Sequence, residues 1–141
     1  VKQIMANFPD ETRLVIRYTP FHEGSEEAVR ILETARLQDR YEPVLEALLA
    51  RQPEWAVHGA PDLEKAWEIA GAAGLDVEQA RREMSSAEID AVLEQDLADV
   101  QSNNVRQTPT FFVNGRLLES FGPQQLYDLV REEVESARAA Q

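Results

Sequence analysis

The chain has 141 residues, of which 43% are hydrophobic and 28% charged, a composition that suits one globular domain with a hydrophobic core. Fourteen basic and 26 acidic residues give a net charge of −12, which argues against nucleic acid and against an anionic membrane surface as partners. There is no cysteine, which excludes disulfides, thiolate metal sites and a cysteine nucleophile within these residues.

The first half of the chain predicts one strand among helices. Residues 1–8 are expected to be the last turns of a helix that Pro9 ends. Residues 12–18 are rich in β-branched and apolar side chains and predict a short strand buried on both faces. Apolar residues at helical spacing predict a helix over 25–38, and a second helix has Pro43 in its first turn.

Residues 52–61 contain two prolines and a glycine and predict a connection, after which three more helices are expected. Asp62 is the predicted N-cap of the first, and Asp76 with Gln79 resembles a capping box for the second. Ser85 with Glu88 is a clearer capping box and opens the long third helix. The expected buried face of this helix is Ile89, Val92, Leu93, Leu97 and Val100.

The end of the chain predicts a hairpin and a final helix. Residues 110–113 and 116–118 are short strands joined by Asn114-Gly115, a pair that tolerates positive φ and is the strongest short-range hairpin signal. Gly122-Pro123 then opens the last helix. The helices in the middle, over 25–104, are therefore interpreted as an insertion within a single domain, 1–141.

Pro109 stands directly before the first hairpin strand, a position where a missing N–H costs the sheet nothing. The residues alone favour a trans bond, since only about 5–6% of X–Pro bonds in folded proteins are cis. A cis bond would turn the chain sharply and expose the backbone N–H and C=O of Thr108. An extended peptide could pair there as an added strand.

The segment Thr-Pro-Thr-Phe-Phe-Val-Asn-Gly-Arg over 108–116 resembles the cis-proline loop and hairpin of DsbA-like thioredoxin-fold disulfide oxidoreductases. Four other stretches agree in order and spacing: Leu14–Tyr18 with Pro20-Phe21-His22, Arg51–Trp55, Ala73–Asp76 and Phe121–Leu126. The resemblance covers nearly the whole chain. It implies an α/β thioredoxin-like fold with a helical insertion between strands, and a cis bond at Pro109. It also implies that Gln107, Thr108 and Pro109 bind substrate.

The departure from the family is equally informative. Family members carry Cys-x-x-Cys at the start of the first helix, where the helix N-terminus lowers the pKa of one thiol. The resemblance implies that Val1 lies past this motif and past the first strand, so no residue of this chain is expected to be catalytic. Only the proline loop carries over.

The missing first strand has a consequence for the sheet. In the family pattern it lies between the strands predicted at 14–18 and 110–113. Without it two strand edges lack a partner, at about 1–3 kcal/mol for each buried orphan group against a total stability of about 5–15 kcal/mol. We therefore expect that the chain does not fold as a monomer with this sheet intact. Either the two strands close up directly, or another chain lends a strand in a homo-oligomer or strand-swapped dimer.

The resemblance implies a thiol-disulfide oxidoreductase that acts on protein dithiols and disulfides through a mixed disulfide. The client would be held as an added strand, without a cofactor, in a periplasmic or secreted protein. Three alternatives stay open: a cysteine-free module that binds a peptide or partner, a related isomerase that uses glutathione, and a mostly helical domain with one hairpin. A trans Pro109 would favour the last.

Other candidate sites carry little chemistry. His22 and His58 have no metal-ligand spacing, and no metal site is expected, although His22 could contact a substrate. The acidic side chains of the long helix, Asp96 among them, are expected on a solvated face. Trp55 and Trp67 are expected to anchor the core or its rim.

Overall fold

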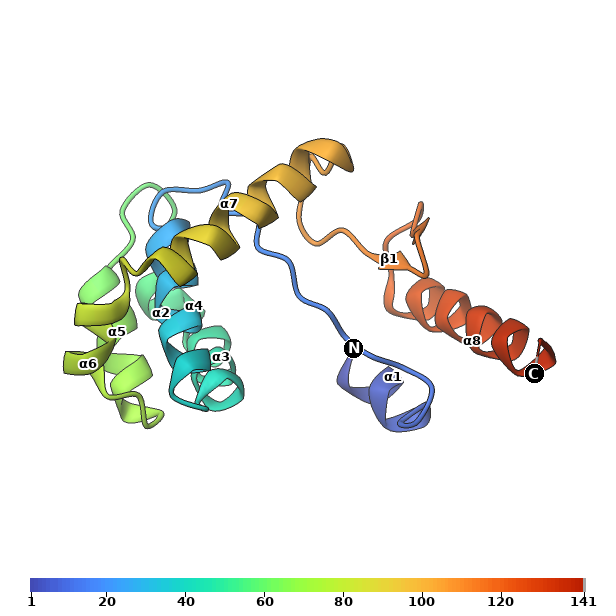
Figure 1. The fold of residues 1–141 in the computed structure, drawn as a ribbon, viewed down its shortest axis with the longest axis horizontal. Helices are drawn as coiled ribbons and strands as arrows, with labels where there is room; N and C mark the ends of the chain where they lie inside the picture. Colours follow the sequence, from blue (N-terminus) through green and yellow to red (C-terminus); the bar gives the residue numbers. More distant parts are fainter. Residues whose placement is uncertain (141) are drawn as a thin grey trace. The chain divides into compact units, whose positions relative to one another are not determined.

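The computed structural model describes residues 1–140 (Figure 1). Contacts divide the chain into two compact units, which are described separately. Unit 1 combines Val1–Arg17 with the residues from Asn103 onward, and unit 2 is Tyr18–Ser102. Unit 1 contains seven basic and seven acidic residues, whereas unit 2 contains seven basic and 19 acidic ones. The whole net charge of −12 therefore belongs to unit 2.

The secondary structure of unit 2 consists of helices joined by loops. Its helices are α2 (Ser25–Leu37), α3 (Tyr41–Ala50), α4 (Gln52–Trp55), α5 (Leu63–Ala72), α6 (Val77–Glu83) and α7 (Ala87–Ser102). The helices predicted over 25–38 and after Asp62 and Asp76 are confirmed. The segment predicted as a connection over 52–61 instead begins with the single turn of α4. Pro53 is compatible with that turn because it stands at its start, where a backbone N–H has no partner within the helix.

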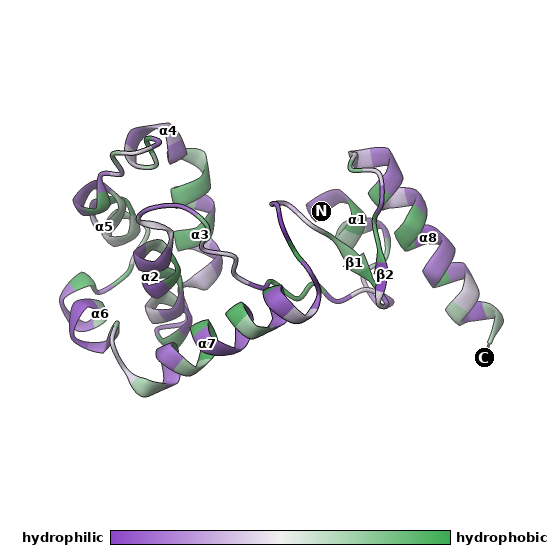
Figure 2. Ribbon diagram, turned by 90° about the horizontal axis from the view of Figure 1, so that it is seen from above, coloured by the Kyte–Doolittle hydropathy of each residue, from purple (hydrophilic) through white to green (hydrophobic). Residues whose placement is uncertain are grey.

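The main core of unit 2 forms where α2, α3 and α5 pack against one another. Ile31, Val44, Trp67 and Ile69 are almost completely buried there, which confirms Trp67 as a core residue. A smaller cluster joins α2 to α7 through Val29, Ile89 and Leu93. Figure 2 shows hydrophobic and hydrophilic stretches alternating along α7, as expected of a helix with one buried face.

Two of the three predicted caps form as expected. The Asp62 carboxylate accepts a hydrogen bond from the Lys65 N–H at 2.9 Å, and Asp76 accepts one from the Gln79 N–H at 3.0 Å. The cap predicted at Ser85 is wrong by one residue, because the hydroxyl oxygen of Ser86 faces the Ile89 N–H at 3.5 Å. Glu88, the expected other half of a box at Ser85, instead forms an ion pair with Arg36 at 2.9 Å.

The buried face of α7 also differs from the prediction. Ile89 and Leu93 are buried as expected, but Leu97 is 42% exposed while Asp96, expected on a solvated face, is only 2% exposed. The reason is a long-range hydrogen bond: the Tyr18 N–H donates to the Asp96 carboxylate at 2.8 Å. The Asp96 carboxylate thus gives a hydrogen-bond acceptor to the backbone N–H of Tyr18, the first residue of unit 2.

The side chain of Tyr18 continues this buried polar network. Its hydroxyl donates to Glu33 at 2.8 Å and lies 3.1 Å from the hydroxyl of Tyr41. Glu33 is 3% exposed and forms an ion pair with Arg36 at 2.7 Å. Burial raises the pKa of Tyr18 well above the ordinary range of tyrosine, and the hydrogen bonds to Tyr41 and Glu33 raise it further. The phenol therefore stays neutral and remains a donor.

Removing this phenol tests the network. We expect Tyr18→Phe to lower the free energy of unfolding by about 1–3 kcal/mol, because buried Glu33 loses a donor. The raised pKa in the folded state means that this contribution is complete below pH about 10 and is lost as the pH rises further. Urea denaturation at neutral and at strongly alkaline pH measures both effects.

The wild type should therefore lose stability above pH about 10 more steeply than Tyr18→Phe does. Tyr127→Phe is the control, since its hydroxyl has no hydrogen-bond partner within residues 1–140. Equal alkaline slopes for the wild type and Tyr18→Phe would contradict the assignment.

Gly24 starts α2 in a left-handed conformation with φ 77°, and a Cβ there would lie 2.8 Å from Cγ of Pro61. Gly59 has nearly the same φ, 76°, but a Cβ there would meet nothing within 4 Å. We expect Gly59→Ala to cost about 1–2 kcal/mol for the backbone conformation alone. Gly24→Ala should cost about 1–3 kcal/mol more because of the overlap. Thermal unfolding of both variants measures the difference, and equal losses would show that Pro61 moves freely.

Unit 1 consists of α1 (Lys2–Asn7), β1 (Phe112–Val113), β2 (Arg116–Leu117) and α8 (Pro123–Ala139). Both helices and the hairpin are confirmed, with strands shorter than predicted. The strands are antiparallel and pair Phe112 with Leu117. Asn114 at φ 49° and Gly115 at φ 81° form the turn, as their sequence predicts.

The predicted strand over 12–18 is wrong. Within residues 1–140 the sheet has two strands, β1 and β2, and residues 13–16 make no backbone–backbone hydrogen bond. Leu14 is 48%, Val15 56% and Ile16 43% exposed, although burial on both faces was expected. A short apolar run becomes a strand only beside a partner strand, and the described residues provide none. The alternative in which this segment pairs directly with β1 is also contradicted. No helix among the described residues is long and apolar enough to cross a membrane.

Candidate functional site

The proline loop, residues 105–110, precedes β1 and contains the three residues predicted to bind substrate. Gln107, Thr108 and Pro109 are all exposed. The Thr108–Pro109 peptide bond is cis, the form that the resemblance implies and that the residues alone did not favour. The structure therefore presents these three residues together on the surface of unit 1.

Two features of the loop backbone define what it can bind. The Thr110 hydroxyl donates to the carbonyl oxygen of Gln107 at 2.7 Å, which ties the loop to the residue that leads into β1. Within residues 1–140 neither the N–H nor the C=O of Thr108 has a hydrogen-bond partner. An unpaired donor and acceptor on one exposed residue are available for pairing with an added peptide strand.

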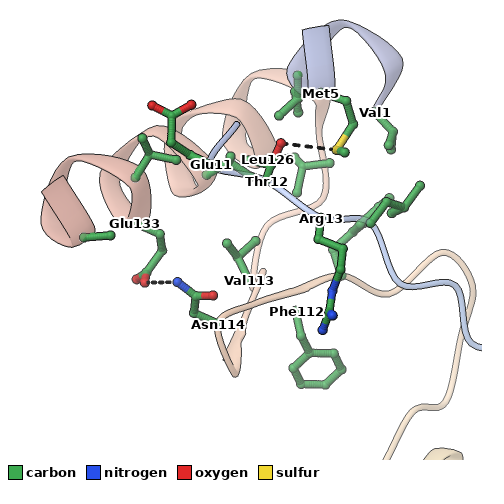
Figure 3. Close-up of a pocket in the computed structure, with 16 residues that line it drawn as sticks. Val1, Met5, Glu11, Thr12, Arg13, Phe112, Val113, Asn114, Leu126 and Glu133 are labelled. Atoms are coloured by element: carbon green, nitrogen blue, oxygen red, sulfur yellow. Dashed lines mark hydrogen bonds between the residues drawn. The ribbon is translucent and has the colours of Figure 1, made fainter. Parts of the chain in front are cut away.

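A groove lies next to this loop in unit 1 (Figure 3). Residues 11–14 form one wall and residues 111–114 the other, while α1 and α8 contribute the remaining lining. The cavity measures about 200 Å³, and most of its lining is aliphatic or aromatic: Val1, Ile4, Met5, Leu14, Phe111, Phe112, Val113, Leu126, Val130, Val134 and Ala137. The groove thus separates the two segments that the sequence predicted on either side of a missing strand.

Polar contacts hold the hairpin wall of the groove against α8. The Asn114 amide donates to Glu133 at 3.0 Å, as Figure 3 shows, and Arg116 binds the same carboxylate at 2.7 Å. The hydrogen bonds from Arg116 and then Asn114 lower the pKa of Glu133. Arg116 also reaches Glu132 at 3.1 Å. The position of β1 is therefore fixed by charge as well as by packing.

Three charged side chains, Glu11, Arg13 and Glu133, line the groove, and the Glu133 carboxylate is bound by Asn114 and Arg116. Among residues 1–140 no three histidine, aspartate or glutamate side chains form a possible metal site. His22 and His58 lie in unit 2 with their ring centroids 5.9 Å apart, edge to face, and both are exposed. What the site does offer is unpaired backbone beside an apolar groove, which suits recognition of an extended polypeptide.

Two contributors to the site were missed from sequence. Thr110 was assigned to the strand, yet its hydroxyl positions the loop, and only its place two residues after Thr108 hinted at this. Phe121 stacks on Phe111 with centroids 6.2 Å apart and planes inclined by 12°. This contact joins the residue before β1 to the segment before α8, and no local pattern indicates it.

Comparisons with known proteins identify the family and the fold of the chain. The family model described as thioredoxin matches residues 1–132. The crystal structure of a thioredoxin-like oxidoreductase from Silicibacter pomeroyi DSS-3 aligns with a TM-score of 0.78 and 30% identity, over 99% of this chain and 76% of the other. The chain therefore belongs to the thioredoxin family, and its fold is thioredoxin-like, mostly helical with a small sheet.

Two curated relatives are much longer proteins. A Na(+)/H(+) antiporter NhaA from Herminiimonas arsenicoxydans is 34% identical over 115 residues, which is 82% of this chain and 18% of that protein. An antiporter NhaA 1 from Mycolicibacterium gilvum is 29% identical over 138 residues, 93% of this chain and 21% of that protein. The chain thus spans about a fifth of the length of these relatives.

The hydrogen bond from Thr110 makes a testable claim about the proline loop. We expect Thr110→Val, which keeps the shape but removes the hydroxyl, to lower the backbone order parameters of Gln107 and Thr108 toward about 0.6. Thr110→Ser keeps the hydroxyl and should leave them near about 0.85. Nuclear magnetic relaxation of ¹⁵N-labelled protein measures both, and identical behaviour of the two variants would show that the hydroxyl does not order the loop.

Proposed function

We propose that the protein is a thiol-disulfide oxidoreductase of the DsbA-like kind that acts on protein dithiols and disulfides. The observation that carries this proposal is the unpaired backbone of Thr108 in an exposed loop ahead of β1. Membership of the thioredoxin family and the likeness to a structure named as a thioredoxin-like oxidoreductase support it. The residues described above form the face that binds the client.

The redox step requires a pair of thiols that residues 1–141 do not contain. A thiolate of that pair attacks one sulfur of a client disulfide, forms a mixed disulfide and releases the other client sulfur as a thiolate. The second thiol of the pair then attacks the mixed disulfide, which leaves the client reduced and the pair oxidised. The reverse sequence oxidises a client dithiol. This chain contributes positioning, because a client strand paired with Thr108 is held beside the reacting sulfurs.

A second candidate is a cysteine-free module that binds a peptide or partner without redox turnover. The absence of cysteine from the chain favours it, and so does the match to about a fifth of two proteins named as antiporters. In this candidate the same proline loop binds an extended segment of a larger protein. Location in the periplasm or outside the cell belongs to the first candidate, since protein disulfides persist there.

The deciding experiment uses the complete product of the gene. We expect the coding sequence for about thirty residues upstream of Val1 to specify a strand followed by Cys-x-x-Cys, the order that a thioredoxin-like unit requires. The purified full-length protein should oxidise a reduced dithiol peptide or reduce a protein disulfide. Replacing both cysteines by serine should abolish turnover while leaving peptide binding intact.

Each other result assigns a different function. A full-length protein without the cysteine pair that still binds extended peptides at Gln107 and Thr108, detected by chemical-shift changes, would replace the first candidate with the second. Turnover that requires glutathione, together with direct glutathione binding, would instead favour an isomerase. A protein with the cysteine pair but without dithiol exchange would contradict the proposal.

A further inference from the structure

The hairpin turn of unit 1 contains an Asn-Gly pair in an open position. Asn114 and Gly115 are both exposed, and a Cβ on Gly115 would meet nothing within 4 Å. The N–H of Gly115 makes no hydrogen bond within residues 1–140, since the strand pairing joins Val113 to Arg116 across the turn. The backbone nitrogen of Gly115 therefore lies in an exposed turn, and no side chain of its own separates it from the Asn114 amide.

These two residues contain the groups for an intramolecular reaction that needs only water. Hydroxide takes the N–H proton of Gly115, and the backbone nitrogen attacks the side-chain Cγ of Asn114. A C–N bond forms, and the side-chain nitrogen takes up a proton and leaves as ammonia. Water then opens the resulting succinimide ring at either of its carbonyl carbons, giving aspartate or isoaspartate. The balance is the loss of ammonia and the gain of water, without oxidation or reduction.

The chain offers an internal comparison in Asn104. Asn104 is exposed and has a left-handed backbone at φ 53°, close to the φ of 49° at Asn114. The residue after it is Val105, whose branched Cβ crowds the attacking nitrogen. The two other asparagines also precede residues with a side chain, so Asn114 is the only asparagine of the chain followed by glycine. Backbone conformation and exposure are thus matched at the two sites, and the following residue differs.

The Asn114 side chain also anchors the hairpin to α8. Its amide donates to the Glu133 carboxylate at 3.0 Å, as Figure 3 shows, and Arg116 binds the same carboxylate at 2.7 Å. An aspartate in its place has no N–H to donate and brings a second negative charge to Glu133. Isoaspartate in addition lengthens the backbone of the turn, which opposes the pairing of Val113 with Arg116.

We propose that Asn114 is a site of spontaneous deamidation, and that its product releases the hairpin from α8. The reactants are the chain itself and water, so the modification accumulates with the age of the protein. The reaction is independent of thiol chemistry and of the client that the proline loop binds. It alters the hairpin that directly follows this loop.

Mass spectrometry of peptides from the 141-residue chain, aged at mildly alkaline pH, tests the reaction. We expect the amide of Asn114 to be lost at least about tenfold faster than that of Asn104, because glycine follows it. Gly115→Ala should slow the loss at Asn114 by about tenfold or more and leave Asn104 unchanged. The added Cβ has room, so circular dichroism should show that this variant retains its helices. Equal rates at the two asparagines, loss at Asn114 only after unfolding in urea, or a rate insensitive to Gly115→Ala would overturn the proposal.

A second pair of variants tests the release of the hairpin. Asn114→Asp reproduces one product, and Asn104→Asp adds the same charge elsewhere in unit 1. Hydrogen bonds from Arg116 and then Asn114 hold the pKa of Glu133 down, and Asn114→Asp removes the second bond and adds a like charge. We therefore expect nuclear magnetic resonance to show that the pKa of Glu133 rises in Asn114→Asp.

The same samples report on the strands themselves. The amides of residues 112–117 should exchange with solvent about tenfold faster in Asn114→Asp than in the wild type. Asn104→Asp should change neither the titration of Glu133 nor this exchange. An unchanged pKa of Glu133 or unchanged hairpin exchange in Asn114→Asp would show that the hairpin stays attached to α8 and would contradict the proposed release.

Discussion

Backbone hydrogen bonding governs unit 1. Strand β1 is paired along one edge only, and residues 13–16, which line the same apolar groove in part, make no backbone–backbone hydrogen bond within residues 1–140. Within residues 1–140 no strand lies between these two segments, and Leu14, Val15 and Ile16 are exposed.

Unit 2 differs from unit 1 because it buries polar side chains and pairs them with one another. Tyr18 gives its N–H to Asp96 and its hydroxyl to Glu33, and Arg36 neutralises Glu33. Every buried side-chain nitrogen and oxygen within the described residues has a hydrogen-bond partner. These hydrogen bonds offset the cost of removing the polar groups from water. The excess of 19 acidic over seven basic residues gives this unit its net charge of −12, and the exposed charges keep its surface solvated.

The division of charge and of structure between the units bears on function. The thioredoxin family assigns the fold, while the proposed client contact rests on Thr108 and the loop that Thr110 holds in place. Unit 1 therefore contains the proposed peptide-binding backbone. Unit 2 contributes a compact acidic body whose core does not depend on that surface.

The sequence by itself determined the features that short-range interactions dictate. Asn114-Gly115 formed its turn and Asp62 and Asp76 capped their helices, because each requires only neighbours within a few residues. The tertiary structure decided the rest. Asp96 is buried because Tyr18 reaches it from 78 residues away, whereas residues 12–18 fail as a strand for want of a neighbour. Burial and strand pairing depend on which other segments pack beside a residue, so the local sequence alone does not determine them.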